Sequence, residues 1–140
     1  MPGVEDTQEA DPFFKINTNR LTIDVLGNKD QSLTFIAKTK ADDTYVGRVD
    51  VTVKKEPMGR VGELSYQLED GYSGQRLTTE ILRATIAYMY AELGLVNLYG
   101  VAPQTNIAAQ YVLQRIGFAL SDAIDGALRY EARNPRFQAI

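Results

Sequence analysis

The segment with the clearest chemical potential is the turn Gly71-Tyr72-Ser73-Gly74-Gln75-Arg76-Leu77-Thr78. Residues 61–68 before it alternate apolar and polar side chains, as in a strand. The apolar residues after it recur at helical spacing and are followed by a glycine at the expected end: Leu82, Ile86, Met89, Leu93 and Gly94. Because the first-turn N–H groups and the dipole of such a helix favour negative charge, the turn predicts a phosphate-binding site. The alternative is a tight turn without a ligand, since short glycine motifs are weak alone.

The candidates for acid–base chemistry are few, because the sequence contains neither cysteine nor histidine. This excludes thiol nucleophiles, Cys/His zinc sites and imidazole bases, and we predict no metal site. Proton transfer must then use carboxylates, tyrosine, lysine or water. Glu63 on the predicted central strand is a candidate general base, although strand carboxylates often simply face water. Several tyrosines are either candidates or half-buried packing residues: Tyr66, Tyr72, Tyr90, Tyr99 and Tyr111.

Length and composition indicate one domain with its own core, since the chain has 140 residues and is 44% hydrophobic. The net charge of -3 and the absence of a dense Lys/Arg stripe argue against a nucleic-acid partner. No apolar run reaches the length of a membrane span, and the N-terminus lacks a basic-then-apolar signal pattern. We therefore expect a soluble cytoplasmic protein without a membrane partner.

The order of predicted elements is four strands, a helix, a strand, a second helix and two short strands. Residues 1–12 are polar and acidic and predict a mobile tail, so the domain is expected to span 13–140. The predicted strands cover 20–26, 32–38, 44–54, 61–68, 96–101, 118–120 and 127–132. The first two are joined by about six residues around Gly27-Asn28-Lys29-Asp30, which is a hairpin connection.

Two stretches resemble the GCN5-related N-acetyltransferase (GNAT) superfamily, in particular the branch that acetylates ribosomal-protein N-termini. Residues 72–82 are similar to its pyrophosphate loop and the helix after it, and residues 106–118 to its Asn-x-x-Ser…Gly-Phe helix. The clear similarity covers residues 61–120, and a weaker similarity is present at residues 19–23. The resemblance implies an α+β fold with a mixed, mainly antiparallel sheet of about seven strands and helices on both faces. It also implies direct transfer of an acetyl group from acetyl-CoA to an amine.

The resemblance assigns roles to particular residues. The turn would hold the pyrophosphate through Ser73, Gly74, Gln75, Arg76, Leu77 and Thr78. A backbone N–H between Tyr66 and Leu68 would polarise the thioester carbonyl. Asn106 would hydrogen-bond the pantetheine, although an asparagine at that place is also a typical helix N-cap. Tyr111 is the nearest candidate for a general acid, one turn from the position where relatives carry a tyrosine.

The sequence also departs from the family pattern. Arg76 stands at the close-approach glycine, where a long side chain obstructs phosphate unless it donates to the phosphate itself. Ala109 and Leu113 replace a serine and the tyrosine that protonates the thiolate. The two helices that wall the acceptor site in relatives have no counterpart, and a homodimer is one way to complete that wall. The alternative to an N-acyltransferase on a small amine or peptide is a GNAT fold that has lost coenzyme A.

Overall fold

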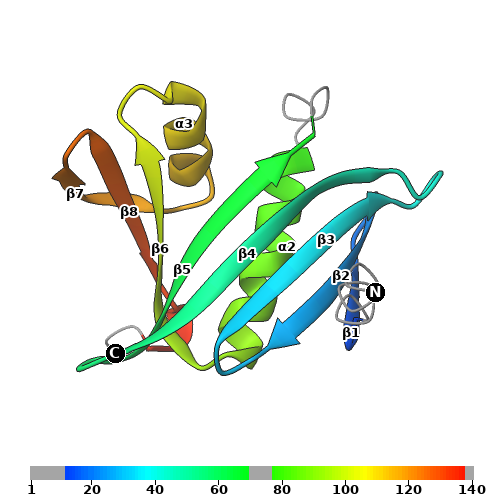
Figure 1. Ribbon diagram of the computed structural model, residues 1–140, viewed down its shortest axis with the longest axis horizontal. Helices are drawn as coiled ribbons and strands as arrows, with labels where there is room; N and C mark the ends of the chain where they lie inside the picture. Colours follow the sequence, from blue (N-terminus) through cyan, green and yellow to red (C-terminus); the bar gives the residue numbers. More distant parts are fainter. Residues whose placement is uncertain (1–11, 70–76, 138–140) are drawn as a thin grey trace, which may run out of the picture.

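The computed structural model describes residues 12–69 and 77–137. The acidic tail and most of the predicted phosphate loop, including Ser73, Gly74, Gln75 and Arg76, therefore lie outside the described residues, and their assignments stay predictions. The described chain forms one sheet, two helices and a short 3-10 turn (Figure 1). Their bounds are β1 Phe14–Asn17, β2 Leu21–Asn28, β3 Ser32–Thr39, β4 Tyr45–Glu56, β5 Gly59–Leu68, α2 Leu77–Glu92, β6 Leu95–Pro103, α3 Ile107–Arg115, β7 Ala119–Ile124, β8 Ala127–Arg133 and η1 Pro135–Phe137.

The strands form an eight-stranded sheet in the order β1-β2-β3-β4-β5-β6-β8-β7. Every neighbouring pair is antiparallel except β5 and β6, which are parallel and joined by the crossover helix α2. The α+β class and the mainly antiparallel mixed sheet are thus confirmed. The sheet has one strand more than the seven that the sequence predicted. This strand is β1, a four-residue edge strand that is too short to show an alternation of apolar and polar residues.

The predicted hairpin between the first two long strands is confirmed, because β2 and β3 pair from Leu21↔Thr39 to Asn28↔Ser32. Among the described residues, no helix stands between these strands, where the family usually has two. The predicted end of the first helix is also confirmed, since Gly94 follows α2 with φ of +65°, a conformation that favours glycine.

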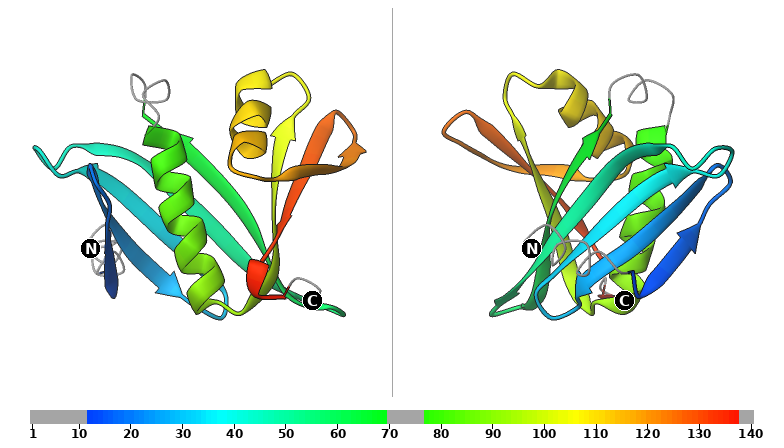
Figure 2. Two further views of the ribbon diagram at one scale, coloured as in Figure 1. Left: turned by 180° about the vertical axis from the view of Figure 1, so that it is seen from behind. Right: turned by 45° about the vertical axis from the view of Figure 1, so that its right-hand side comes forward.

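One face of the sheet carries the core. Along β4, Val49 and Val51 point to this face and are fully buried, and they lie opposite Tyr66 and Leu64 of β5. Helix α2 covers this face with the four apolar residues that its spacing predicted: Leu82, Ile86, Met89 and Leu93. In Figure 1 the helix lies behind the strands, and the reverse view of Figure 2 shows it in front of them.

Helix α3 packs on the same face as α2, whereas the sequence predicted helices on both faces. Its buried Leu113 lies against Gly100 of β6, close enough that a Cβ on Gly100 would be 3.3 Å from Leu113 Cδ2. Gly100 pairs with Leu64 on one side and Tyr130 on the other, and all of them contribute to this face. The opposite face of the sheet is therefore covered by no helix of the described residues.

Candidate functional site

Strands β5 and β6 separate near the middle of the sheet. Their pairing runs from Arg60↔Leu95 only to Leu64↔Gly100, although β5 continues to Leu68. Strand β6 instead remains paired with β8 as far as Pro103↔Ala127. The two central parallel strands therefore diverge, as Figure 1 shows, and leave a gap between the end of β5 and the end of β6.

The backbone of β5 directs alternate N–H groups into this gap. The Glu69 N–H donates to the Val46 carbonyl of β4 at 3.0 Å, so this opposed pair is a hydrogen-bonded one. Because hydrogen-bonded and non-hydrogen-bonded pairs alternate along an antiparallel ladder, Ser65 and Gln67 also bond to β4. The N–H groups of Tyr66 and Leu68 then point away from β4, towards the gap. These two donors match the backbone positions where the sequence predicted an oxyanion site.

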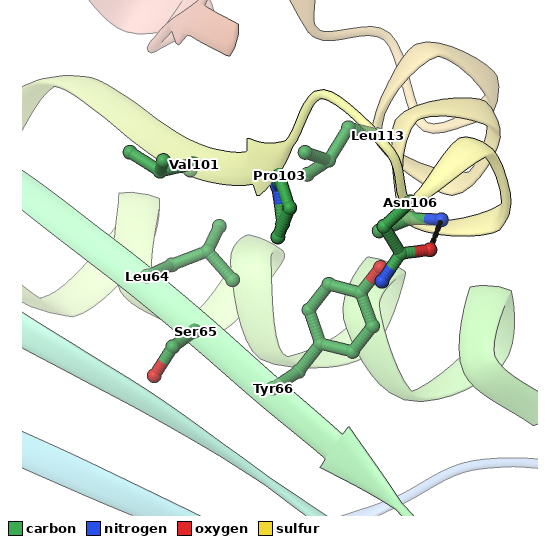
Figure 3. A pocket seen from close by; sticks show the side chains of 9 residues that line it. Leu64, Ser65, Tyr66, Val101, Pro103, Asn106 and Leu113 are labelled. Atoms are coloured by element: carbon green, nitrogen blue, oxygen red, sulfur yellow. Dashed lines mark hydrogen bonds between the residues drawn. The ribbon is translucent and has the colours of Figure 1, made fainter. Parts of the chain in front are cut away.

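Two adjoining cavities open around the gap. The first has a volume of about 210 Å³ and is lined by Leu64, Ser65, Tyr66, Gly100, Val101, Pro103, Asn106, Ala109 and Leu113. The second has a volume of about 390 Å³ and is lined by Tyr66, Leu68, Thr78, Asn106, Ala108, Ala109 and Val112. Three residues, Tyr66, Asn106 and Ala109, line both. Figure 3 shows the first cavity between β5 and the end of β6.

The structure shows one of the two roles that the sequence left open for Asn106, and the other, binding of pantetheine, stays a prediction. Asn106 is the N-cap of α3, and its side-chain Oδ1 accepts the Ala109 N–H at 3.0 Å. The cap uses only the oxygen of the amide. Its Nδ2 forms no hydrogen bond with the described residues and faces the cavities, where it is available as a donor to a ligand.

Of the described residues that line the two cavities, Tyr66 alone is titratable. Its side chain comes from β5 on the helix-covered face, and Figure 3 shows its hydroxyl directed towards Asn106. Burial raises the pKa of the Tyr66 phenol above its ordinary value of 10.0, because the phenolate would lose hydration. The phenol is therefore protonated at neutral pH and can donate a proton.

The start of helix α2 faces the second cavity. Thr78 lines it, whereas the side chain of Leu77 is buried in the core, so Leu77 can offer a ligand only its backbone N–H. Glu80 ties this first turn to the segment before β2. Its carboxylate accepts hydrogen bonds from the Thr18 hydroxyl at 2.6 Å, the Arg20 backbone N–H at 3.0 Å and Arg20 Nε at 2.8 Å.

The two predicted catalytic residues lie outside these cavities. Glu63 points to the opposite face of the sheet, where its carboxylate is 2.8 Å from Lys54 Nζ and accepts a hydrogen bond from the Tyr99 hydroxyl at 3.4 Å. This pairing raises the pKa of Lys54 to about 12. Tyr111 is 59% exposed on α3, and its hydroxyl accepts a hydrogen bond from Arg115 at 3.1 Å. The structure therefore does not bring Glu63 and Tyr111 together with Asn106 and Thr78.

The sequence did not single out several apolar lining residues. They lie where the two strands diverge, and nothing in the sequence distinguishes them from other strand residues: Leu64, Gly100, Val101 and Pro103. A signal for Gly100 existed, since glycine inside a strand often marks a close approach by another element. Here the approaching element is α3.

Comparison with known proteins gives the family. A family model described as the acetyltransferase (GNAT) domain matches residues 1–119. Because this match covers more than half of the sequence, the chain belongs to the GNAT acetyltransferase family. Curated proteins gave no match to the sequence.

Many solved structures share the fold, and the following three are among them. A proposed ribosomal-protein-serine acetyltransferase from Vibrio cholerae has a TM-score of 0.73 and 17% identity, over 87% of this chain and 98% of its own. The ribosomal-protein-S5-alanine acetyltransferase from Vibrio fischeri has a TM-score of 0.67 and 18% identity, over 77% and 64%. The spermidine N-acetyltransferase from Vibrio cholerae, in complex with CoA and spermine, has a TM-score of 0.66 and 14% identity, over 76% and 68%.

Family and fold together support acyl transfer from an acyl-CoA in general terms. At such low identities, the structural likeness establishes the fold and leaves the acceptor open. Among the described residues, no helix is long and apolar enough to cross a membrane.

Proposed function

We propose that the protein transfers an acyl group, in the simplest case acetyl, from acyl-CoA to an amino group by direct attack. The observation that carries this proposal is the gap between β5 and β6, with its two cavities and two inward-pointing N–H groups. Pantetheine would lie in the gap, where Asn106 Nδ2 donates to one of its amide oxygens. The N–H groups of Tyr66 and Leu68 would stabilise negative charge on the thioester oxygen.

The phosphates are proposed to sit at the start of α2. Thr78 at this end lines the larger cavity, and a helix of 16 residues presents its positive dipole end there. Ser73, Gly74, Gln75 and Arg76 complete this proposal from the sequence alone.

The acceptor is proposed to be an amine that enters from the uncovered face of the sheet. The fold-sharing proteins named above are described as acting on spermidine or on ribosomal proteins, which supports an amine as the acceptor class. The uncovered face favours an exposed amino group on a peptide or an extended polyamine, because no helix of the described residues encloses the substrate there.

The test is binding of acetyl-CoA and of free CoA, measured by calorimetry and by the shift in melting temperature. We expect both ligands to raise the melting temperature, and we expect Gly74→Asp to abolish this rise because it adds negative charge to the phosphate loop. Gln31→Glu is the matched control: it adds the same charge to the exposed hairpin between β2 and β3. That hairpin adjoins the far end of α2, since Lys29 bonds Glu92 at 3.1 Å. A folded protein that shows no shift at millimolar ligand would favour a fold that has lost coenzyme A.

A further inference from the structure

We propose that Tyr66 is the general acid of the acyl transfer and protonates the departing thiolate. This inference rests on the proposed function. It is carried by the position of the Tyr66 side chain, which lines both cavities and stands at their junction. A thioester that reaches from the larger cavity into the smaller one must pass this phenol.

The other polar groups around the cavities do not supply an acid. Within residues 12–69 and 77–137, the polar lining residues apart from Tyr66 are Ser65, Thr78 and Asn106. None of these three side chains is an acid with a pKa comparable to that of a phenol, about 10, or of a thiol, about 8.5, so none can protonate a thiolate. Leu113 on α3 reaches the smaller cavity but has no proton to give.

The hydroxyl of Tyr66 is also uncommitted. Most half-buried tyrosine hydroxyls find a hydrogen-bond partner. The Tyr66 hydroxyl has none among the described residues, although Figure 3 shows it directed towards Asn106. A protonated phenol that faces a cavity without a protein partner is suited to a partner that arrives with the ligand.

The proton balance of the step is complete. The amine nitrogen attacks the thioester carbon, a C–N bond forms and the C–S bond breaks. The electron pair of the broken bond stays on sulfur, which takes the Tyr66 proton and leaves as the thiol. The nitrogen of the product then loses its extra proton to the Tyr66 phenolate through water, which restores the phenol. No oxidant or further reactant is needed.

The test compares Tyr66→Phe with the unaltered protein by release of free thiol from acetyl-CoA. The chain contains no cysteine, so a thiol reagent reports the released thiol without a background from the protein. Spermidine and a short peptide with a free α-amino group serve as acceptors. We expect kcat to fall about a hundredfold, the lower end of what a positioned acid contributes. We expect the dissociation constant of acetyl-CoA to change by less than about threefold, because the ring is kept.

A second probe separates an acid from a packing role. The acetyl thioester of a nitrophenyl thiol releases a thiolate that needs no proton, so Tyr66→Phe should reduce its turnover only about twofold. Tyr90→Phe is the matched control. Tyr90 is also half-buried, and burial raises its pKa to about 12, but it does not line either cavity. We expect its kcat to match that of the unaltered protein.

An unchanged kcat in Tyr66→Phe would overturn this role alone. An equal loss with both thioesters, or a parallel loss of acetyl-CoA affinity, would also overturn it in favour of a packing role. If the unaltered protein binds acetyl-CoA but releases thiol with neither acceptor, the acyl-transfer proposal fails and the role fails with it.

Discussion

The two faces of the sheet are built from the same strands, but they differ in what covers them. On the covered face, fully buried apolar residues such as Val51 and Phe35 pack under α2 and α3. On the uncovered face, neighbouring residues of the same strands form cross-strand polar contacts, for example from Thr34 to Asp50 at 2.7 Å. A period of two along each strand thus separates the residues that stabilise the fold from those that meet solvent.

The uncovered face nevertheless buries one aromatic side chain. Tyr99 is only 7% exposed, because the Arg129 guanidinium stacks 3.8 Å from its ring centre and Lys54 lies 5.9 Å from it on the same face. Charged side chains thus shield this ring on a face that no helix of the described residues covers. The comparison teaches that long polar side chains can cover a strand residue without closing the face to a substrate.

The largest expected contrast between the faces lies within β3. Phe35→Ala removes a fully buried ring from the covered face, and we expect a loss of about 3–5 kcal/mol in the free energy of unfolding. Ile36→Ala changes the next residue, which is half-buried on the uncovered face, and should cost only about 1 kcal/mol. Urea unfolding of the two variants measures both values. Equal losses would show that the uncovered face is covered in solution, as in the predicted homodimer.

An intermediate effect is expected at the contact between Glu80 and the segment before β2. Burial acts to raise the pKa of the Glu80 carboxyl, but the hydrogen bonds from Thr18 and Arg20 outweigh it, so the pKa lies below its usual 4.5. Glu80→Gln should cost about 1–2 kcal/mol near neutral pH, because charge-assisted hydrogen bonds are lost. Glu80→Asp, which keeps the charge on a shorter side chain, is the comparison variant.

The pH dependence of that loss follows from the lowered pKa of Glu80. A carboxyl whose folded pKa is lowered stabilises the fold above its unfolded pKa and loses this contribution as the pH falls through the folded value. The stability difference between Glu80→Gln and the unaltered protein should therefore be constant above about pH 5.5 and vanish in acid below the folded pKa. A difference that persists unchanged in strong acid would contradict the assigned hydrogen bonds.

The smallest effect is expected for an ion pair on the uncovered face. Asp50 lies 2.7 Å from Arg48, and the two side chains are 34% and 43% exposed. Asp50→Asn should cost less than about 1 kcal/mol, because solvent screens a pair this exposed. The loss should shrink in 1 M salt, where the screening length is about 3 Å. A double-mutant cycle with Arg48→Gln isolates the pair, and a coupling above about 2 kcal/mol would contradict this picture of an open face.

The sequence predicted the elements whose residues follow one clear period. The four apolar residues of α2 and the alternation in β5 were sufficient to place the central helix and strand. The hairpin between β2 and β3 followed from its turn residues. Neither the period of the apolar residues nor the turn residues predict the face of the sheet on which α3 packs. It depends on Gly100, which lacks a side chain and lets Leu113 approach β6 from the side that α2 occupies.

The site was predicted in part for a similar reason. Asn106 and Thr78 were found because a cap residue and a helix start leave local marks in the sequence. Glu63 and Tyr66 lie three residues apart on β5, and strand alternation sends them to opposite faces. Which face holds the cavities is decided by tertiary packing, so the sequence favoured Glu63 as the residue for proton transfer and the structure favours Tyr66.

The divergence of β5 from β6 also gives one strand two kinds of amide proton. Those of Ser65 and Gln67 are bound to β4 and can exchange with solvent deuterium only when the ladder opens. Those of Tyr66 and Leu68 face the gap and have no strand partner there, so they exchange at the rate at which water reaches them. At the end of β5, every second backbone amide is therefore protected from exchange, and the amides between them have no hydrogen-bond acceptor in the sheet. A bound acyl chain that supplies this acceptor would make the protection continuous.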